Sequence, residues 1–185
     1  MASEWVTAKA LLDRHQRVWQ SKTSLRTIYG HYFEIMFRNS ISGRTLEIGA
    51  GSGNLRDSGY DVISTDIVKM SCVDVVSDAH SLPFADGSLA NIVAVDVFHH
   101  LQRPVRFLRE ARRLLKPGGR LIMLEPGITW VSGVLYRKFH PEPVDMTANP
   151  LINKPSSGNW GPFDANQAVA TLLSFTIREC KTSIS

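Results

Sequence analysis

The middle of the chain alternates short apolar runs with glycine-rich turns and amphipathic segments. The apolar runs lie at residues 45–48, 60–65, 73–76, 89–95 and 120–124. Continuous apolar runs of this kind are typical of strands buried on both faces in a parallel sheet. Because helical segments separate them, the expected connections are right-handed crossovers that place helices on both faces. The pattern therefore predicts an α/β fold with a Rossmann-like, doubly wound and mostly parallel sheet.

Two amphipathic helices are predicted before the first strand. The helix over residues 3–20 carries Leu11, Leu12, His15, Val18 and Trp19 at helical spacing. The helix over residues 24–37 has as its apolar residues Tyr29, Tyr32, Phe33, Met36 and Phe37. These aromatic rings either pack on the sheet or belong to a lid over a ligand crevice, in which Tyr29, His31 or Tyr32 would close a pocket. Residues 1–43 are therefore expected to form a helical N-terminal cap.

The second half of the chain contains further predicted helices and one more strand. A helix over residues 104–115 begins with Pro104, and its apolar face consists of Val105, Leu108, Ala111, Leu114 and Leu115. After residue 126 the pattern weakens. A helix is predicted over residues 130–139, a loop over 140–162, and a helix over 167–173 that Asp164 caps. Residues 175–180 alternate as an edge strand does.

Composition and charge narrow the class of protein. The 185 residues suit a single domain, and no apolar run reaches the roughly 18 residues of a membrane span. The two cysteines are far apart and lack metal-ligand spacing, so we expect reduced thiols, a cytoplasmic location and no metal site. The net charge is +4, but the densest basic cluster, over residues 103–116, has the period of a solvated helix face. Nucleic-acid binding is therefore not expected.

A glycine-rich turn follows the first predicted strand. Gly49, Gly51 and Gly53 stand at alternate positions after residues 45–48. Glycine has no Cβ, so the backbone can turn sharply and a ligand can lie against it. A strand, such a turn and a helix form the first half of a nucleotide-binding unit, although a tight connection alone would have the same residues. Asp66, at the end of the second strand, is the expected acceptor for ribose hydroxyls; its alternative role is an N-cap.

Four landmarks in this order resemble the class I S-adenosylmethionine-dependent methyltransferases. They are LEIGAGSGN at 46–54, ISTDI at 63–67, Asp78-Ala79 followed by LPFADGSLANIVAVDVFHHL, and LLKPGGRLIMLEP at 114–126. The nearest resemblance is to the small-molecule branch that includes the ubiquinone and menaquinone biosynthesis enzymes. It implies one methyltransferase-like domain over residues 1–185, with a cofactor-binding core at 44–126 and a substrate-side region at 127–185.

The resemblance implies a role for each matching position. The residues that would line the methionine part of the cofactor are Glu47, Gly49, Ala50, Gly51 and Gly53, and Asn54 is a further cofactor-binding candidate. Asp66 would bind the ribose hydroxyls and Ile67 would lie against the adenine. Asp78 would accept the adenine amino proton, and Ala79 would offer a backbone donor. Asp96 and Val97 would lie beside the sulfonium of S-adenosylmethionine, which leaves the reaction as S-adenosylhomocysteine.

The expected reaction is methyl transfer to a small-molecule acceptor, through an oxygen, nitrogen or carbon atom that the sequence does not determine. Alignment of the reactants supplies much of the catalysis, and a base is needed only where the acceptor is protonated. His100 and His99 are the candidate bases, although either ring could instead cap a helix or pack under the lid. Glu125 is a further pocket-facing candidate, and Tyr136 and His140 lie in the substrate-side region. The Asn/Asp-Pro-Pro-Tyr/Phe motif of nucleic-acid amino methyltransferases is absent after the fourth strand.

Two alternatives to this function remain open. One is a methyltransferase-like module that binds cofactor but has little or no activity. The other is a nicotinamide-dependent oxidoreductase, although such enzymes use GxGxxG at a helix start to hold a pyrophosphate, and the spacing here is GxGxG. The resembled family usually completes its sheet with an antiparallel hairpin, whereas one candidate strand follows here. We therefore expect a shortened sheet, a short variant or truncated product, and a homodimer through the incomplete edge.

Overall fold

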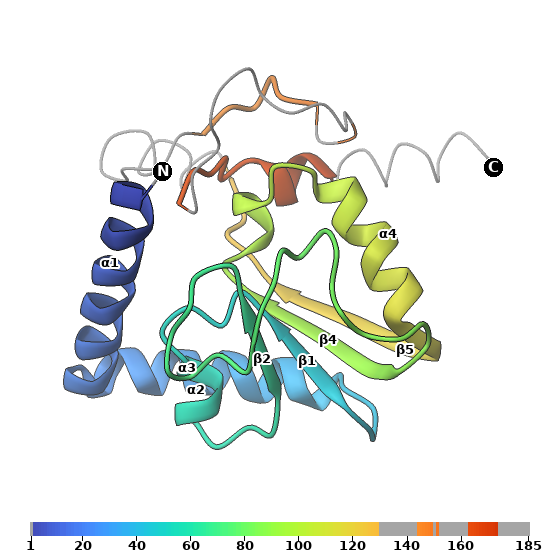
Figure 1. Ribbon diagram of the computed structural model, residues 1–185, viewed down its shortest axis with the longest axis horizontal. Coiled ribbons are helices and arrows are strands. Elements are labelled where there is room, and N and C mark those ends of the chain that lie inside the picture. The colour runs from blue at the N-terminus through green and yellow to red at the C-terminus, as the bar shows by residue number, and fades with distance from the viewer. Residues whose placement is uncertain (1, 130–143, 150, 152–162, 174–185) are drawn as a thin grey trace.

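The computed structural model describes residues 2–129, 144–149, 151 and 163–173, and its centre is a parallel sheet (Figure 1). The sheet has five strands in the order β3-β2-β1-β4-β5, and every neighbouring pair is parallel. The strands are β1 (Thr45–Ile48), β2 (Ile63–Asp66), β3 (Val75–Val76), β4 (Leu89–Val95) and β5 (Leu115–Leu124). The strand order reverses between β1 and β4, which confirms the predicted doubly wound sheet.

The helices predicted over residues 3–20, 24–37 and 104–115 are present, with small differences at their ends, and the helices before residue 129 also include two short turns. They are α1 (Ala2–Ser21), α2 (Thr23–Arg38), the single turn α3 (Asn54–Asp57), the 3-10 turn η1 (Phe98–His100) and α4 (Pro104–Leu114). The described helices include none long and apolar enough to cross a membrane. Gly53 precedes α3 in a left-handed conformation, so the chain leaves the glycine turn directly into that short helix.

Three strand boundaries differ from the sequence prediction. β2 begins at Ile63 rather than residue 60, and β3 contains only Val75 and Val76. Just before β3, the Asp74 carboxylate accepts a hydrogen bond from the Ser64 amide at 2.9 Å. β5 begins at Leu115 because that residue already pairs with Leu89, with an irregularity in the register before the next pair. The Lys-Pro-Gly-Gly stretch therefore lies within β5 as a bulged beginning of the strand.

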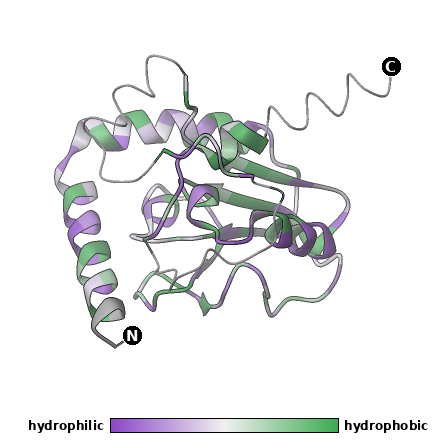
Figure 2. Cartoon of the chain, turned by 90° about the horizontal axis from the view of Figure 1, so that it is seen from above, coloured by the Kyte–Doolittle hydropathy of each residue, from purple (hydrophilic) through white to green (hydrophobic). Residues whose placement is uncertain are grey.

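The two faces of β4 show why helices cover both sides of the sheet. Ile92 and Ala94 pack in one core cluster with residues of α4, whereas Val93 packs in another with residues of α1 and α2. Alternate residues of a strand face opposite sides, so a strand that is apolar throughout needs a partner layer on each side. Figure 2 shows hydrophilic and hydrophobic residues along α4, as expected for a helix with one buried face. Phe107, which the predicted apolar face omitted, is fully buried there.

Part of the C-terminal region is also described. Residues 169–173 are helical, within the predicted range of 167–173. Asn166 Oδ1 accepts a hydrogen bond from the Ala168 amide at 3.1 Å. Residues 144–149 contain no helix or strand, in agreement with the predicted loop. The predicted helix over 130–139 and strand over 175–180 lie outside the described residues.

Candidate functional site

A cavity of about 780 Å³ lies at the carboxyl ends of β1, β2 and β4, and residues of α1 and α2 also line it. The carboxyl edge at a reversal of strand order is the usual ligand site of this architecture. The wall includes every candidate cofactor residue except Gly53, and both histidine candidates. These residues are Glu47, Gly49, Ala50, Gly51, Asn54, Asp66, Ile67, Asp78, Ala79, Asp96, Val97, His99 and His100.

The glycine turn presents bare backbone to this cavity. Gly49 has φ +65°, and a Cβ there would lie 2.4 Å from Val97 Cγ2, so the close approach of Val97 requires glycine. A Cβ on Gly51 would meet nothing closer than 3.7 Å, so no side chain crowds this backbone, which lines the cavity. The assignment of Gly53 to the cofactor is not supported by the cavity. Its Cβ would lie 2.8 Å from that of Cys72, so Gly53 serves the packing of the turn.

Asp66 connects the end of β2 to the glycine turn. Its Oδ2 accepts a hydrogen bond from the Gly51 amide at 2.8 Å, and its Oδ1 accepts one from the Val68 amide at 2.8 Å. Burial raises the pKa of Asp66, and these backbone bonds oppose the rise. The bond to Val68 closes a local turn, but residues 67–74 contain no helix for Asp66 to cap. Each carboxylate oxygen accepts more than one hydrogen bond, so Asp66 can still accept from a ligand in the cavity.

Glu47 is a buried carboxylate in the wall of the cavity, with 4% of its surface exposed. Ser64 Oγ donates a hydrogen bond to its Oε2 at 2.8 Å. Burial raises the pKa of Glu47 to about 7, while the Ser64 bond and the charge of Arg56 act in the opposite direction. A cationic ligand group beside Glu47 would favour the ionised form.

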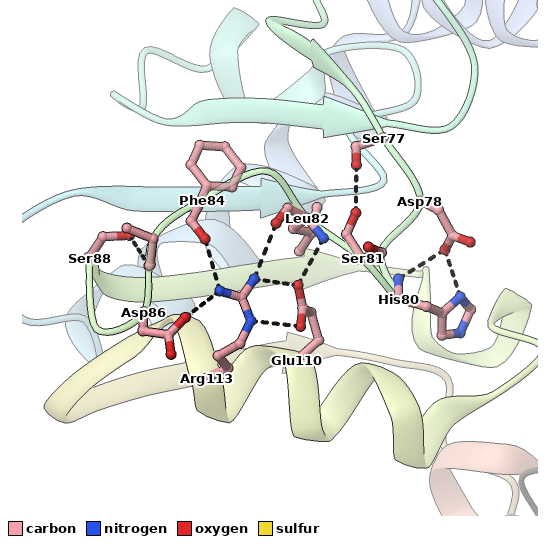
Figure 3. Close-up of polar contacts among 11 residues, drawn as sticks. Ser77, Asp78, His80, Ser81, Leu82, Phe84, Asp86, Ser88, Glu110 and Arg113 are labelled. Atoms are coloured by element: carbon pink, nitrogen blue, oxygen red, sulfur yellow. Dashed lines mark hydrogen bonds and ion pairs between the residues drawn. The ribbon is translucent and has the colours of Figure 1, made fainter.

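Asp78 belongs to a compact turn after β3 (Figure 3). Its Oδ1 accepts hydrogen bonds from the backbone amide and the Nδ1 of His80, at 2.9 and 2.6 Å, and Ser77 Oγ donates to the Ser81 carbonyl at 3.1 Å. Both Asp78 and His80 line the cavity. His80 was not predicted as a site residue, although the Asp-x-His spacing could have indicated a local side-chain bond.

Arg113 of α4 holds the chain that follows this turn (Figure 3). Its guanidinium donates to the Phe84 and Leu82 carbonyls at 2.9 and 3.2 Å, and to the carboxylates of Glu110 and Asp86. Glu110 in turn accepts a hydrogen bond from the Leu82 amide at 2.8 Å. The segment between β3 and β4 is therefore tied to α4, which fixes the turn that carries Asp78.

The end of β4 meets the N-terminal helices through Asp96 and Tyr29. Asp96 has a left-handed backbone, with φ 54°, a conformation that is strained for residues other than glycine and frequent at functional sites. Tyr29 Oη donates a hydrogen bond to Asp96 Oδ2 at 2.8 Å. Burial raises the pKa of Asp96, and the Tyr29 bond opposes the rise. Of the three predicted lid residues only Tyr29 lines the cavity, whereas His31 and Tyr32 are exposed and do not.

Glu125 positions the two-histidine turn rather than facing the cavity. Its Oε1 accepts hydrogen bonds from the Val97 and Phe98 amides at 2.9 and 2.6 Å, and its Oε2 lies 2.7 Å from His99 Nδ1. Glu125 is not among the cavity residues, so the prediction that it faces the pocket is wrong. Three backbone amides and the His99 ring, all in the segment after β4, surround its carboxylate.

In both His99 and His100, the Nδ1 atom of the ring faces a hydrogen-bond acceptor. His99 Nδ1 faces the Glu125 carboxylate, and His100 Nδ1 lies 3.2 Å from the Asp164 carbonyl oxygen. Because both partners are acceptors, Nδ1 carries the proton in each neutral ring and Nε2 is the accepting nitrogen. The ring centroids lie 4.3 Å apart. Tyr136 and His140, the other candidates, lie outside the described residues.

Sequence reasoning missed much of the wall that lies away from the glycine turn. These residues come from α1, α2, the segment after η1 and the region after residue 162, and include Leu12, His15, Val18, Trp19, Leu25, Gln102, Phe163 and Gln167. The helical pattern marked Leu12 and Trp19 as apolar, but the same pattern marks ordinary core residues. No local spacing distinguishes a residue that packs on the sheet from one that borders the cavity.

Together these features define an α/β domain with a ligand cavity at the switch point of its sheet, built from bare backbone and carboxylates. Residues 46–123 match the family model described as "Methyltransferase domain". A demethylmenaquinone methyltransferase of Beutenbergia cavernae is 33% identical over 96 residues, which cover 44% of this chain and 40% of that protein. A demethylmenaquinone methyltransferase of Thermotoga maritima is 42% identical over 65 residues, covering 34% of this chain and 28% of that protein. The matches thus span less than half of the length of these relatives.

A solved structure shares the fold. A Thermotoga maritima protein described as an "SAM-dependent methyltransferase, possible histamine N-methyltransferase" aligns with a TM-score of 0.60 and 23% identity, covering 73% of this chain and 68% of that one. Residues 46–123 thus match a methyltransferase domain, and S-adenosylmethionine is the cofactor that this match implies. The residues present fit that cofactor, because the backbone at Gly51 and the carboxylates of Asp66 and Asp78 border one cavity.

Proposed function

We propose that this protein transfers a methyl group from S-adenosylmethionine to a small-molecule acceptor. The observation that carries the proposal is the continuity of the cavity. One space of about 780 Å³ borders the glycine turn and Asp66 as well as Asp96, His99 and His100. A donor held at the first group and an acceptor at the second would share this space, and such proximity contributes roughly 7 to 11 kcal/mol to a two-substrate reaction.

The residues of the glycine turn and of β2 would hold the cofactor. The resemblance assigns the ribose hydroxyls to Asp66 and the adenine edge to Asp78 and Ala79, with Ile67 against the ring. Glu47 would meet the methionine part, where its pKa of about 7 allows it to ionise beside an ammonium group. When bound, the cofactor supplies a methyl carbon activated by positively charged sulfur. Asp96 and Val97 would border that carbon.

His99 or His100 would accept a proton from the acceptor where the acceptor carries one. Both rings line the cavity, and in both the accepting nitrogen is Nε2. Glu125 would hold the His99 ring in that tautomer, as a carboxylate orients the histidine of a catalytic triad. His99 Nδ1 thereby faces a carboxylate and His100 Nδ1 faces a backbone carbonyl.

A small-molecule acceptor is supported by the names of the relatives and by one absent motif. Two relatives carry the name demethylmenaquinone methyltransferase. The segment after β4 reads Asp96-Val97-Phe98-His99 instead of the acidic-aromatic motif of enzymes that methylate nucleic-acid bases. A cytoplasmic location and a homodimer through the edge of the sheet remain predictions.

Calorimetric titration of the full chain with S-adenosylmethionine, S-adenosylhomocysteine and NAD tests the proposal. We expect the first two to bind and NAD to show no measurable heat of binding. Methyl transfer is then measured over a panel of small acceptors. Binding without transfer to any acceptor would favour the alternative of a cofactor-binding module with little activity, and the absence of binding would contradict the proposal itself.

A further inference from the structure

The wall of the cavity is rich in carboxylates and poor in cations. Among the described residues, four acidic side chains line it, Glu47, Asp66, Asp78 and Asp96, and neither lysine nor arginine does. The basic residues of the chain, which give it a net charge of +4, therefore lie elsewhere as far as the described residues go. A cavity with one sign of charge raises the local concentration of ligands of the opposite sign.

The protein compensates these charges only in part. Burial raises the pKa of Glu47, Asp66 and Asp96, which means that the ionised form of each is under-stabilised without a ligand. His15, also in the wall, has its pKa lowered by burial and by the charge of Arg14, so this ring stays neutral. A cationic ligand would therefore stabilise the ionised form of these carboxylates.

The four carboxylates divide between two ends of the cavity. Glu47, Asp66 and Asp78 belong to the strand ends of β1, β2 and β3, where the proposed cofactor lies. Asp96 stands at the end of β4 with Tyr29, whose ring packs against Trp19 and Phe33 at centroid distances of 6.1 and 5.8 Å. The hydrogen bonds of the described residues include one to Asp96 Oδ2 and none to its Oδ1. A carboxylate with an available oxygen beside aromatic rings is the usual chemistry for recognising an organic ammonium.

We propose that the methyl acceptor is an amine that enters the cavity as a cation and binds through its ammonium group to Asp96. The inference rests on the proposed function and names the substrate class of the same site. The N–H groups of the amine donate to Asp96, and the apolar part of the amine lies along the rings of Tyr29, Trp19 and Phe33. The amine gives one proton to a histidine Nε2. Its nitrogen then forms the N–C bond to the methyl carbon as the C–S bond of the cofactor breaks, and the electron pair of that bond goes to sulfur.

Three matched probes test this inference on the full chain saturated with S-adenosylhomocysteine. Tyramine is cationic, 4-ethylphenol is neutral and 3-(4-hydroxyphenyl)propionate is anionic, while the ring is the same in all three. We expect tyramine to bind on the order of tenfold more tightly than 4-ethylphenol, and the propionate most weakly. Equal binding of tyramine and 4-ethylphenol, or tighter binding of the propionate, would overturn the inference.

Two variants test whether Asp96 is the source of the preference for tyramine over 4-ethylphenol. Asp96→Asn removes the charge in the cavity and should abolish the preference for tyramine over 4-ethylphenol. Asp61→Asn removes an exposed charge outside the cavity and should keep it. A preference that survives Asp96→Asn would contradict the role of Asp96. If S-adenosylhomocysteine itself fails to bind the parent protein, the proposed function fails first; if it binds and the order of the probes is reversed, only the amine inference fails.

Discussion

The two ends of the cavity are built by different means. The cofactor side, defined by Gly49, Gly51, Asp66 and Asp78, consists of backbone and short side chains that follow three neighbouring strands. The acceptor side, defined by Tyr29, Asp96, His99 and His100, brings together side chains from α2, from β4 and from η1. On the cofactor side the carboxylates bond to nearby backbone amides, as Asp66 does with Gly51. On the acceptor side Tyr29 and Asp96 meet across 67 positions of sequence.

This difference indicates which part of the site tolerates change. The geometry of the cofactor side depends on positions that require glycine and on backbone N–H groups, which a side-chain substitution does not remove. The acceptor side depends on side chains that can each be replaced without moving a strand. We therefore expect substitutions on the cofactor side to lower stability and cofactor binding together, and substitutions on the acceptor side to change ligand preference with a smaller loss of stability.

The largest effect is expected for Gly49→Ala. The new Cβ would overlap Val97 at 2.4 Å, and the backbone has φ +65°. Strain and overpacking together should lower the free energy of unfolding by roughly 2 to 5 kcal/mol and abolish binding of S-adenosylhomocysteine. Gly59→Ala is the matched control, because Gly59 has φ +86° with nothing within 4 Å. Equal losses in urea unfolding for the two variants would show that the contact with Val97 does not matter.

An effect of intermediate size is expected for Glu47→Gln, and it depends on pH. The pKa of Glu47 is about 7 in the folded protein, against 4.5 for an unperturbed glutamate, so its contribution is fully present below pH 4.5 and lost as the pH rises through 7. Glutamine mimics the protonated form at every pH. The variant should match the parent in acid and exceed its unfolding free energy by up to about 3 kcal/mol above pH 7.

Glu110→Gln provides a control of opposite sign for that experiment. Hydrogen bonds from Arg113 lower the pKa of Glu110, so its ionised form stabilises the fold and this contribution is lost as the pH falls through the folded pKa. Relative to the parent, Glu110→Gln should lose stability as the pH rises, whereas Glu47→Gln should gain it. Urea unfolding at several pH values measures both, and parallel pH curves for the two variants would contradict the assigned burial of Glu47.

The smallest effect is expected for Tyr29→Phe. The variant removes the hydroxyl that donates to Asp96 Oδ2 and keeps the ring contacts with Trp19 and Phe33. The loss of one hydrogen bond should lower the unfolding free energy by about 1 kcal/mol. Tyr32→Phe, on the same helix, is the control, because Tyr32 is 41% exposed and does not line the cavity. Thermal or urea unfolding that shows no difference between the two variants would contradict the Tyr29–Asp96 contact.

The difference between the cofactor side and the acceptor side also explains which features could be predicted from the sequence. The strands of the sheet, the glycine turn and the place of Asp66 were predictable because apolar runs and glycine spacing are local patterns. The packing role of Gly53 was not predictable, because spacing does not show that its missing Cβ makes room for Cys72. The prediction for Glu125 was wrong because its three partner residues lie in the connection after β4, far from Glu125 in the sequence. They meet Glu125 only because β4 and β5 are neighbours in the sheet. Phe163 also lines the cavity, although it lies far in the sequence from the glycine turn, so no local pattern predicts its position.

The central claim is that Asp66 and the glycine turn hold the adenosyl part of the cofactor in this cavity. Calorimetric titration of S-adenosylhomocysteine into the parent, Asp66→Ala and the exposed-site control Asp61→Ala tests it most directly. Loss of a carboxylate that accepts ligand hydrogen bonds should raise the dissociation constant on the order of tenfold or more in Asp66→Ala, while Asp61→Ala binds as the parent does. A dissociation constant for Asp66→Ala equal to that of the parent would contradict the account.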